Sequence, residues 1–124
     1  MANQGIFIGF GNPVRGREGK SLEIFNEAMQ YYARLEEAAT IESWEVALLE
    51  PHGGELSGFF LLRGQREKLS ELRGDAEFRR LTTRASLIVD QLGVVNAALH
   101  LGHLTFLPGG IGAGDFKTAL QWTH

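Results

Sequence analysis

The sequence predicts an α+β domain in which two helices cover one face of a four-stranded antiparallel sheet. Three observations lead to this fold class. Two long apolar runs flank a turn at residues 51–54, residues 18–37 carry apolar side chains at helical spacing, and short apolar runs lie at 5–11 and 94–101. With a broken helical stretch between 65 and 92, the order is strand, helix, strand, strand, helix, strand.

The composition is that of one ordinary globular domain. The chain has 124 residues, a net charge of -3 and no cysteine. The negative charge argues against a nucleic-acid partner, and the absence of cysteine excludes disulfides and thiolate metal sites. We find no signal peptide and no apolar run long enough to span a bilayer, so we expect a cytoplasmic protein with no membrane partner. The expected boundaries are 1–101 for the domain and 102–124 for a glycine-rich C-terminal extension.

The first strand and the first helix occupy the first third of the chain. The run Gly5–Gly11 is apolar, with glycines where another backbone or a ligand comes close. A helix is predicted from Glu18 to Glu37, because apolar residues recur there every three or four positions. The residues expected to face the core are Leu22, Phe25, Ala28, Met29, Tyr32 and Leu35.

The stretch from Ile41 to Gly64 organises the rest of the chain. Its two apolar runs are rich in the aromatic and bulky residues that strands favour, and Pro51-His52-Gly53-Gly54 between them favours a turn. A buried helix is the alternative, but the proline and the glycines cut each run to strand length. We therefore expect a hairpin whose strands are apolar on both faces.

The second helix is expected in two pieces, followed by the last strand. Residues 65–73 predict a short helix that Gly74 ends, and Asp75 restarts the helix as an N-cap. We expect the second piece to continue to Gly93. Residues 94–101 then form the last strand. The stripe that supports the long second piece is Phe78, Leu81, Ala85, Ile88 and Leu92.

A ferredoxin-like βαββαβ unit is the simplest fold with this order, with the first and last strands central or adjacent. Two helices cover only one face of such a sheet, yet these strands are apolar on both faces. A bare apolar face of that extent is unusual on a monomer. We therefore expect a homodimer in which the uncovered sheet faces of two copies meet.

With its two-faced sheet and with LRGDAEF at the restart of the second helix, the chain resembles the dimeric α+β barrel superfamily over residues 5–101. That superfamily includes antibiotic-biosynthesis-type monooxygenases, EthD-like proteins and stress-responsive barrel proteins. The stretches IESWEVALLEPHGGELSGFFLLRG and ASLIVDQLGVV are similar to an uncharacterised branch of small bacterial proteins. The resemblance implies a dimeric barrel and no assigned activity.

Alternation along each strand predicts which side chains face the helices. We expect Trp44, Phe60 and Val95 on the helix side, together with the residues two positions away from each. A pocket between the uncovered face and a partner would then contain four polar residues among apolar walls. If the predicted register of a strand is wrong by one residue, every side chain of that strand points to the opposite face. The polar candidates are Glu45, Arg63, Asn96 and His100, and the further ligand-binding candidates are Phe59, Leu61 and Trp44.

These residues have both structural and catalytic interpretations. Glu45 and Arg63 can form a cross-strand ion pair, and His100 can be an ordinary interface histidine. In the catalytic interpretation, His100 is the proton-transfer base, because imidazole titrates near neutral pH. Arg63 and Asn96 would then stabilise oxyanion charge. The resemblance adds that cofactor-free monooxygenases of the superfamily use Asn, Trp and Arg, which are the types of Asn96, Trp44 and Arg63.

No cofactor and no metal are expected. His100 and His103 would point to opposite faces of a strand, and the sequence contains no phosphate-binding loop, dinucleotide fingerprint or nucleophile elbow. The haem-degrading members of the superfamily use a histidine on the second helix, and residues 85–92 contain none.

Two classes of function remain open. One is a cofactor-independent oxygenase or isomerase that acts on a small hydrophobic substrate in the barrel cavity. The other is a non-enzymatic ligand-binding or assembly module whose sheet face serves dimerisation. An enclosed cavity larger than a few water volumes favours the first class, and a sheet face filled by Phe59, Leu49 and side chains of the partner favours the second.

Overall fold

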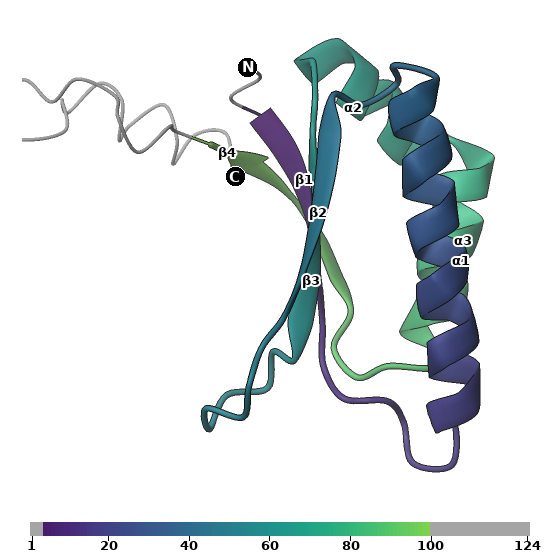
Figure 1. The fold of residues 1–124 in the computed structure, drawn as a ribbon, viewed down its shortest axis with the longest axis vertical. Helices are drawn as coiled ribbons and strands as arrows, with labels where there is room; N and C mark the ends of the chain where they lie inside the picture. Colours follow the sequence, from purple (N-terminus) through teal and green to yellow (C-terminus); the bar gives the residue numbers. More distant parts are fainter. Residues whose placement is uncertain (1–3, 100–124) are drawn as a thin grey trace, which may run out of the picture.

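The computed structural model describes residues 4–99, which fold into one sheet and a layer of helices (Figure 1). The sheet is antiparallel with strand order β2-β3-β1-β4. This is the ferredoxin-like arrangement, so the predicted fold class is confirmed, and β1 and β4 are adjacent as expected. The elements are β1 Gln4–Phe10, α1 Glu18–Glu37, β2 Ser43–Leu48, β3 Gly58–Arg63, α2 Arg66–Gly74, α3 Ala76–Ser86 and β4 Gly93–Ala98.

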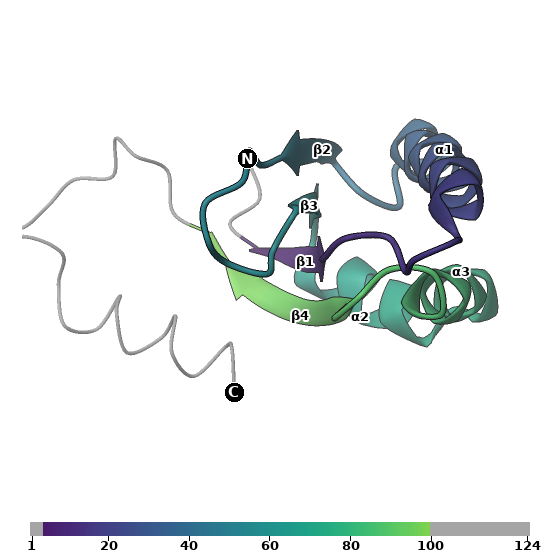
Figure 2. The same cartoon turned by 90° about the horizontal axis from the view of Figure 1, so that it is seen from below.

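The three helices all lie on one side of the sheet (Figure 2). The core fills the space between the two layers, because β1 and β3 are the central strands and point alternate side chains toward the helices. From these strands come Ile6, Ile8, Phe60 and Leu62, each at most 5% exposed. They pack against residues of the three helices, among them Ile24, Ala28, Tyr32, Leu69, Phe78 and Leu81.

The predicted helix starts are confirmed. Helix α1 spans Glu18–Glu37, and the Asp75 side chain caps α3 by accepting hydrogen bonds from the amides of Glu77 (3.0 Å) and Phe78 (3.2 Å). One predicted core residue is wrong, since Leu22 is 63% exposed. The buried stripe of α1 is centred on Ile24, and two helical positions correspond to about 200° of rotation, which turns Leu22 outward.

Helix α3 ends at Ser86, so the predicted continuation to Gly93 is wrong. Residues 87–92 instead form a loop that pairs with the loop after β1. The Val14 amide donates to the Ile88 carbonyl at 2.6 Å, and Pro13 forms an isolated bridge with Val89. The backbone of residues 88 and 89 is thus used for pairing between loops, while Ile88 still packs against the core.

The predicted hairpin is confirmed, with a longer connection than the tight turn that we expected. Strands β2 and β3 pair antiparallel, but residues 49–57 separate them. The Leu49 amide donates to the Ser57 carbonyl at 2.8 Å, so the pairing continues one residue beyond the two strands before the loop begins. Gly53 has a φ of +86°, a conformation that favours glycine, and His52 is exposed.

Some predictions fall on the C-terminal part of the chain. The extension 102–124 and His100 lie outside the described residues. Within residues 4–99, no helix combines the length and the apolar character needed to cross a bilayer.

Candidate functional site

Four of the predicted site residues lie together on the sheet face opposite the helices, which we call the open face. They are Glu45, Phe59, Leu61 and Arg63 from β2 and β3. An Arg63 Nη donates to a Glu45 carboxylate oxygen at 3.0 Å, so the predicted cross-strand ion pair is confirmed. The Glu45 side chain is 56% exposed, and exposed pairs of this kind contribute about 0–1 kcal/mol.

The open face is less bare than the sequence suggested. Phe7 and Phe59 stack with ring centroids 5.1 Å apart. Gly5 has no side chain, and both Leu61 and Leu99 come close to the position that its Cβ would occupy. Leu61 is consequently only 8% exposed, although it lies on the sheet face that we expected to be bare in a monomer. Phe7 and Phe59 are half-buried, and the more exposed apolar side chains are Leu49 at 38% and Val95 at 51%.

The predicted face assignment of the last strand is wrong. Asn96 pairs with Ile6 and Val94 pairs with Ile8, both on the helix side. An Arg73 Nη from α2 donates to the Asn96 side-chain oxygen at 3.0 Å, and its other Nη donates to the Val94 carbonyl at 3.2 Å. The sequence has valine at both 94 and 95, so alternation alone did not fix the face. Ala98, expected on the open face, belongs with Asn96 on the helix side.

The predicted pocket is therefore not assembled as one site. Trp44 lies on the helix side as predicted, where its ring centroid is 6.2 Å from that of Tyr32 and 6.4 Å from that of Phe60. Asn96 is on the same side at the opposite edge of the sheet. Arg63 is on the open face, separated from Trp44 and Asn96 by the sheet.

A cavity of about 60 Å³ lies between the helices and the sheet. Its walls come from α1, α3, the two central strands and the loop after α3, and none of the lining side chains is charged. The two helices contribute Ser21, Ile24, Phe25, Ala28, Tyr32, Leu81, Thr82 and Ala85, and the rest of the wall is Ile8, Phe10, Phe60, Val89 and Leu92.

The polar groups of this helix-side cavity are hydroxyls. The Thr82 hydroxyl is engaged with the main-chain carbonyls of Phe78 and Arg79, both at 3.1 Å. Tyr32 is 2% exposed, and its ring contacts the rings of Tyr31, Trp44 and Phe60. Burial raises the pKa of Tyr32, and the nearby Tyr31 adds to the rise. Tyr32 therefore presents a neutral phenol in an apolar cavity at physiological pH.

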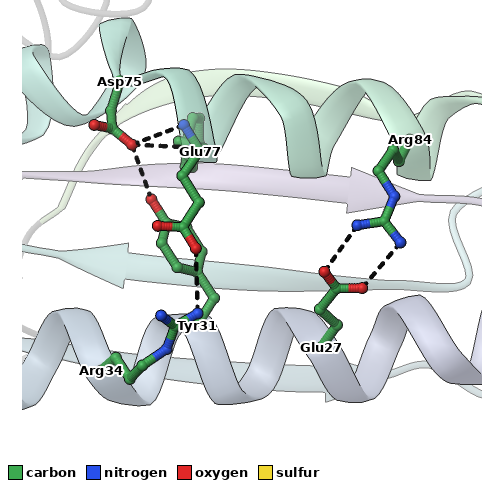
Figure 3. A network of polar contacts seen from close by, with 7 residues as sticks. Glu27, Tyr31, Arg34, Asp75, Glu77 and Arg84 are labelled. Carbon is green, nitrogen blue, oxygen red and sulfur yellow. Dashed lines mark hydrogen bonds and ion pairs between the residues drawn. The ribbon is translucent and has the colours of Figure 1, made fainter.

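Polar contacts join α1 and α3 above the core (Figure 3). Arg84 and Glu27 form a bidentate pair with distances of 2.8 and 3.0 Å, which lowers the pKa of Glu27. Nearer to α2, Arg34 contacts Glu77 at 3.3 Å, and the Tyr31 hydroxyl donates to Asp75 at 3.4 Å. Burial first, and then the charge of Asp75, raises the pKa of Tyr31 to about 12.

Sequence reasoning counted Tyr32 as a core residue and missed the cavity. The signal in the sequence is the row of small side chains Ser21, Ala28, Thr82 and Ala85 on two helices that face one sheet. Small residues on facing helices leave space, but only the structure shows that they face each other. Within the part of the chain that the structure describes, no cluster of His, Asp and Glu could hold a metal ion.

The fold is shared with several solved structures of low sequence identity. A dimeric protein of unknown function with a ferredoxin-like fold from Bacteroides fragilis aligns with a TM-score of 0.56 at 11% identity, over 78% of this chain and 97% of its own. SnoaB, a cofactor-independent oxygenase from Streptomyces nogalater, aligns with a TM-score of 0.55 at 10% identity, over 84% of this chain and 100% of its own. A putative antibiotic biosynthesis monooxygenase from Chloroflexus aurantiacus aligns with a TM-score of 0.51 at 14% identity, over 88% and 99%.

Known families and curated sequences give no further match. No protein-family profile matches the chain, and no curated protein matches its sequence. The predicted resemblance to the dimeric α+β barrel superfamily is thus confirmed at the level of the fold.

Proposed function

We propose that this chain binds a small hydrophobic molecule in the helix-side cavity and forms a homodimer through the open face of its sheet. The cavity carries the first part of the proposal. Its lining is apolar and uncharged, with a neutral Tyr32 phenol in the wall. Apolar concavities with a few placed polar groups are typical ligand sites.

The phenol of Tyr32 sets the polarity of the expected ligand. A hydrogen bond from the Tyr32 hydroxyl to an oxygen of the ligand would add about 0.5–1.5 kcal/mol to the binding free energy. A ligand with one carbonyl, phenol or similar oxygen would accept this hydrogen bond while its apolar part fills the cavity. We therefore expect an aromatic or alicyclic molecule with a single oxygen near one end.

The cavity is small for such a ligand. Its volume of about 60 Å³ corresponds to roughly two water molecules at about 30 Å³ each in the liquid. An engineered cavity that takes up benzene measures about 150 Å³, so a whole ring needs more room than this cavity provides. Binding should therefore be weak for large molecules and should depend on the packing of α1 and α3.

The open face supports the homodimer. Phe7, Phe59 and Leu61 form an apolar floor, and exposed Leu49 and Val95 flank it. Burial of about 500 Å² of apolar area per subunit would contribute roughly 12 kcal/mol, against a docking cost of about 4–15 kcal/mol. Two subunits contribute area, which favours association. The aligned Bacteroides fragilis protein is described as dimeric.

A cofactor-independent oxygenase is the enzymatic candidate, because SnoaB shares the fold and is described by that activity. In this candidate, Tyr32 would donate its hydrogen bond to the oxygen of the substrate where negative charge develops. Arg63 and Asn96 lie on opposite sides of the sheet and do not act on one substrate together. The role of His100 as the proton-transfer base stays a prediction.

Calorimetric titration with phenol and with benzene tests the ligand site. We expect phenol to bind more tightly than benzene, because only phenol has an oxygen for Tyr32. Tyr32→Phe should remove this difference, a change of about 0.5–1.5 kcal/mol in binding free energy. Ala85→Leu should fill the cavity and weaken both ligands. If both probes bind equally to all three proteins, the cavity is not the ligand site.

A further inference from the structure

Helix α2 lies over the end of the sheet where β1 begins and β4 ends (Figure 1). Three polar residues of these elements, which we call the edge cluster, meet there: Gln4 of β1, Arg73 of α2 and Asn96 of β4. Gln4 pairs with Ala98, two residues beyond Asn96, so Gln4 and Asn96 are diagonal neighbours on the helix side of the sheet. Such neighbours lie about 7–8 Å apart, a distance that a small molecule between them can bridge.

Arg73 is a half-buried cation that no carboxylate neutralises within residues 4–99. It follows the buried Leu69 by one helical turn, which directs it toward the sheet. Its two Nη atoms donate to neutral acceptors, the Asn96 side-chain oxygen at 3.0 Å and the Val94 carbonyl at 3.2 Å. A guanidinium has five N–H donors, and the Asn96 amide keeps its NH2 group beside them, so further donors remain for an anion.

Gln4 adds an acceptor to these donors. Among the described residues, its side-chain oxygen is buried and accepts no hydrogen bond. Buried polar atoms are nearly always hydrogen-bonded, so this oxygen points to a donor from outside the described chain. An ionised carboxylate cannot supply that donor, because it only accepts, and an ammonium group would be repelled by Arg73. A hydroxyl group meets both conditions.

We propose that the edge cluster binds a small 2-hydroxy carboxylate. The carboxylate accepts hydrogen bonds from the Arg73 guanidinium and the Asn96 amide, and the neighbouring hydroxyl donates to the Gln4 oxygen. Because Arg73 and Asn96 are half-buried and β4 is an edge strand, the cluster can be reached from solvent. The site goes beyond the proposed function, since none of its three residues lines the helix-side cavity.

NMR titration of isotope-labelled protein with glycolate and with acetate, at constant ionic strength, tests this site. The side-chain NH2 signals of Gln4 and Asn96 and the Nε–H signal of Arg73 report on the three contacts directly. We expect glycolate to bind about two- to tenfold more tightly than acetate, the factor for one neutral hydrogen bond. Gln4→Leu should remove this preference and leave the affinity for acetate unchanged, because leucine offers no acceptor.

Two arginine variants separate a specific site from general attraction of anions. Arg73→Gln should weaken the binding of both anions about tenfold or more, as expected for the loss of a charge-assisted hydrogen bond. Arg79→Gln removes the same charge from an exposed position on α3 and should leave both affinities unchanged. If Arg73→Gln does not fold, Asn96→Asp takes its place: the new carboxylate would pair with Arg73 and repel the anion, so binding should be lost.

The proposal is overturned if glycolate and acetate bind equally to the unsubstituted protein, or if neither anion shifts the three side-chain signals. It is also overturned if Arg79→Gln weakens binding as much as Arg73→Gln does. A preference for glycolate that survives Gln4→Leu has the same consequence, because the hydroxyl would then have another partner. None of these outcomes bears on the helix-side cavity, so the proposed function is tested separately.

Discussion

Asp75→Ala should destabilise the protein through two measurable losses. The Asp75 carboxylate accepts the amides of Glu77 and Phe78 at 3.0 and 3.2 Å, and loss of such an N-cap costs about 1 kcal/mol. It also accepts the Tyr31 hydroxyl at 3.4 Å, a long hydrogen bond that we assign about 0.5 kcal/mol. The sum of about 1.5 kcal/mol corresponds to a fall in Tm of about 6 °C, at roughly 4 °C per kcal/mol.

Urea titration followed by far-ultraviolet circular dichroism measures this loss, with two matched variants. Asp75→Asn keeps an oxygen that caps the helix, so it should cost only a few tenths of a kcal/mol. Glu67→Ala removes an acid from the first turn of α2 without touching a cap, and should likewise have little effect. Equal losses for Asp75→Ala and Asp75→Asn would show that the charge, and not the cap, stabilises α3, and would refute the reasoning.

Three further outcomes follow from the structure. Phe59→Glu places a charge beside Phe7 on the open face and should split the proposed dimer or unfold the protein. If sedimentation of the unsubstituted protein shows a folded 13.7 kDa monomer, the dimer is contradicted. Ala39→Gly should raise the free energy of unfolding by about 1 kcal/mol, because Ala39 has a φ of +61°; an unchanged urea midpoint would count against strain there. The pKa of Tyr31 is raised from 10 to about 12 in the folded protein. Because unfolding frees the phenol to ionise, the free energy of unfolding should fall as the pH rises from about 10 to 12. In urea titrations at each pH, Tyr31→Phe should remove part of this fall in the free energy of unfolding.

The sequence was sufficient for the fold because its local signals agree. Asp75 after Gly74 marks both the end of α2 and the start of α3, and the hairpin is bounded by Pro51 and the glycines that follow it. The sequence was insufficient where a local pattern is compatible with two assignments of the strand faces. Val94 and Val95 are both apolar, and only the pairing of Asn96 with Ile6 fixes the face of β4.

The site was harder to predict for the same reason. Glu45 and Arg63 are opposite types on paired strands, and their contact could be foreseen. The helix-side cavity depends on how α1 approaches α3, which no spacing along one helix determines. Tyr32 has the periodicity of a core residue and is one, so its position in the cavity wall becomes visible only in three dimensions.

The most direct test of the helix-side ligand site is an NMR titration of isotope-labelled protein with phenol. Methyl and amide shifts report on every wall of the cavity separately. We predict that the largest changes occur at Ile8, Ile24 and Leu81, which line the cavity from β1, α1 and α3. Changes confined to Phe59 and Leu61 on the open face, or no changes up to the solubility of phenol, would contradict the proposal.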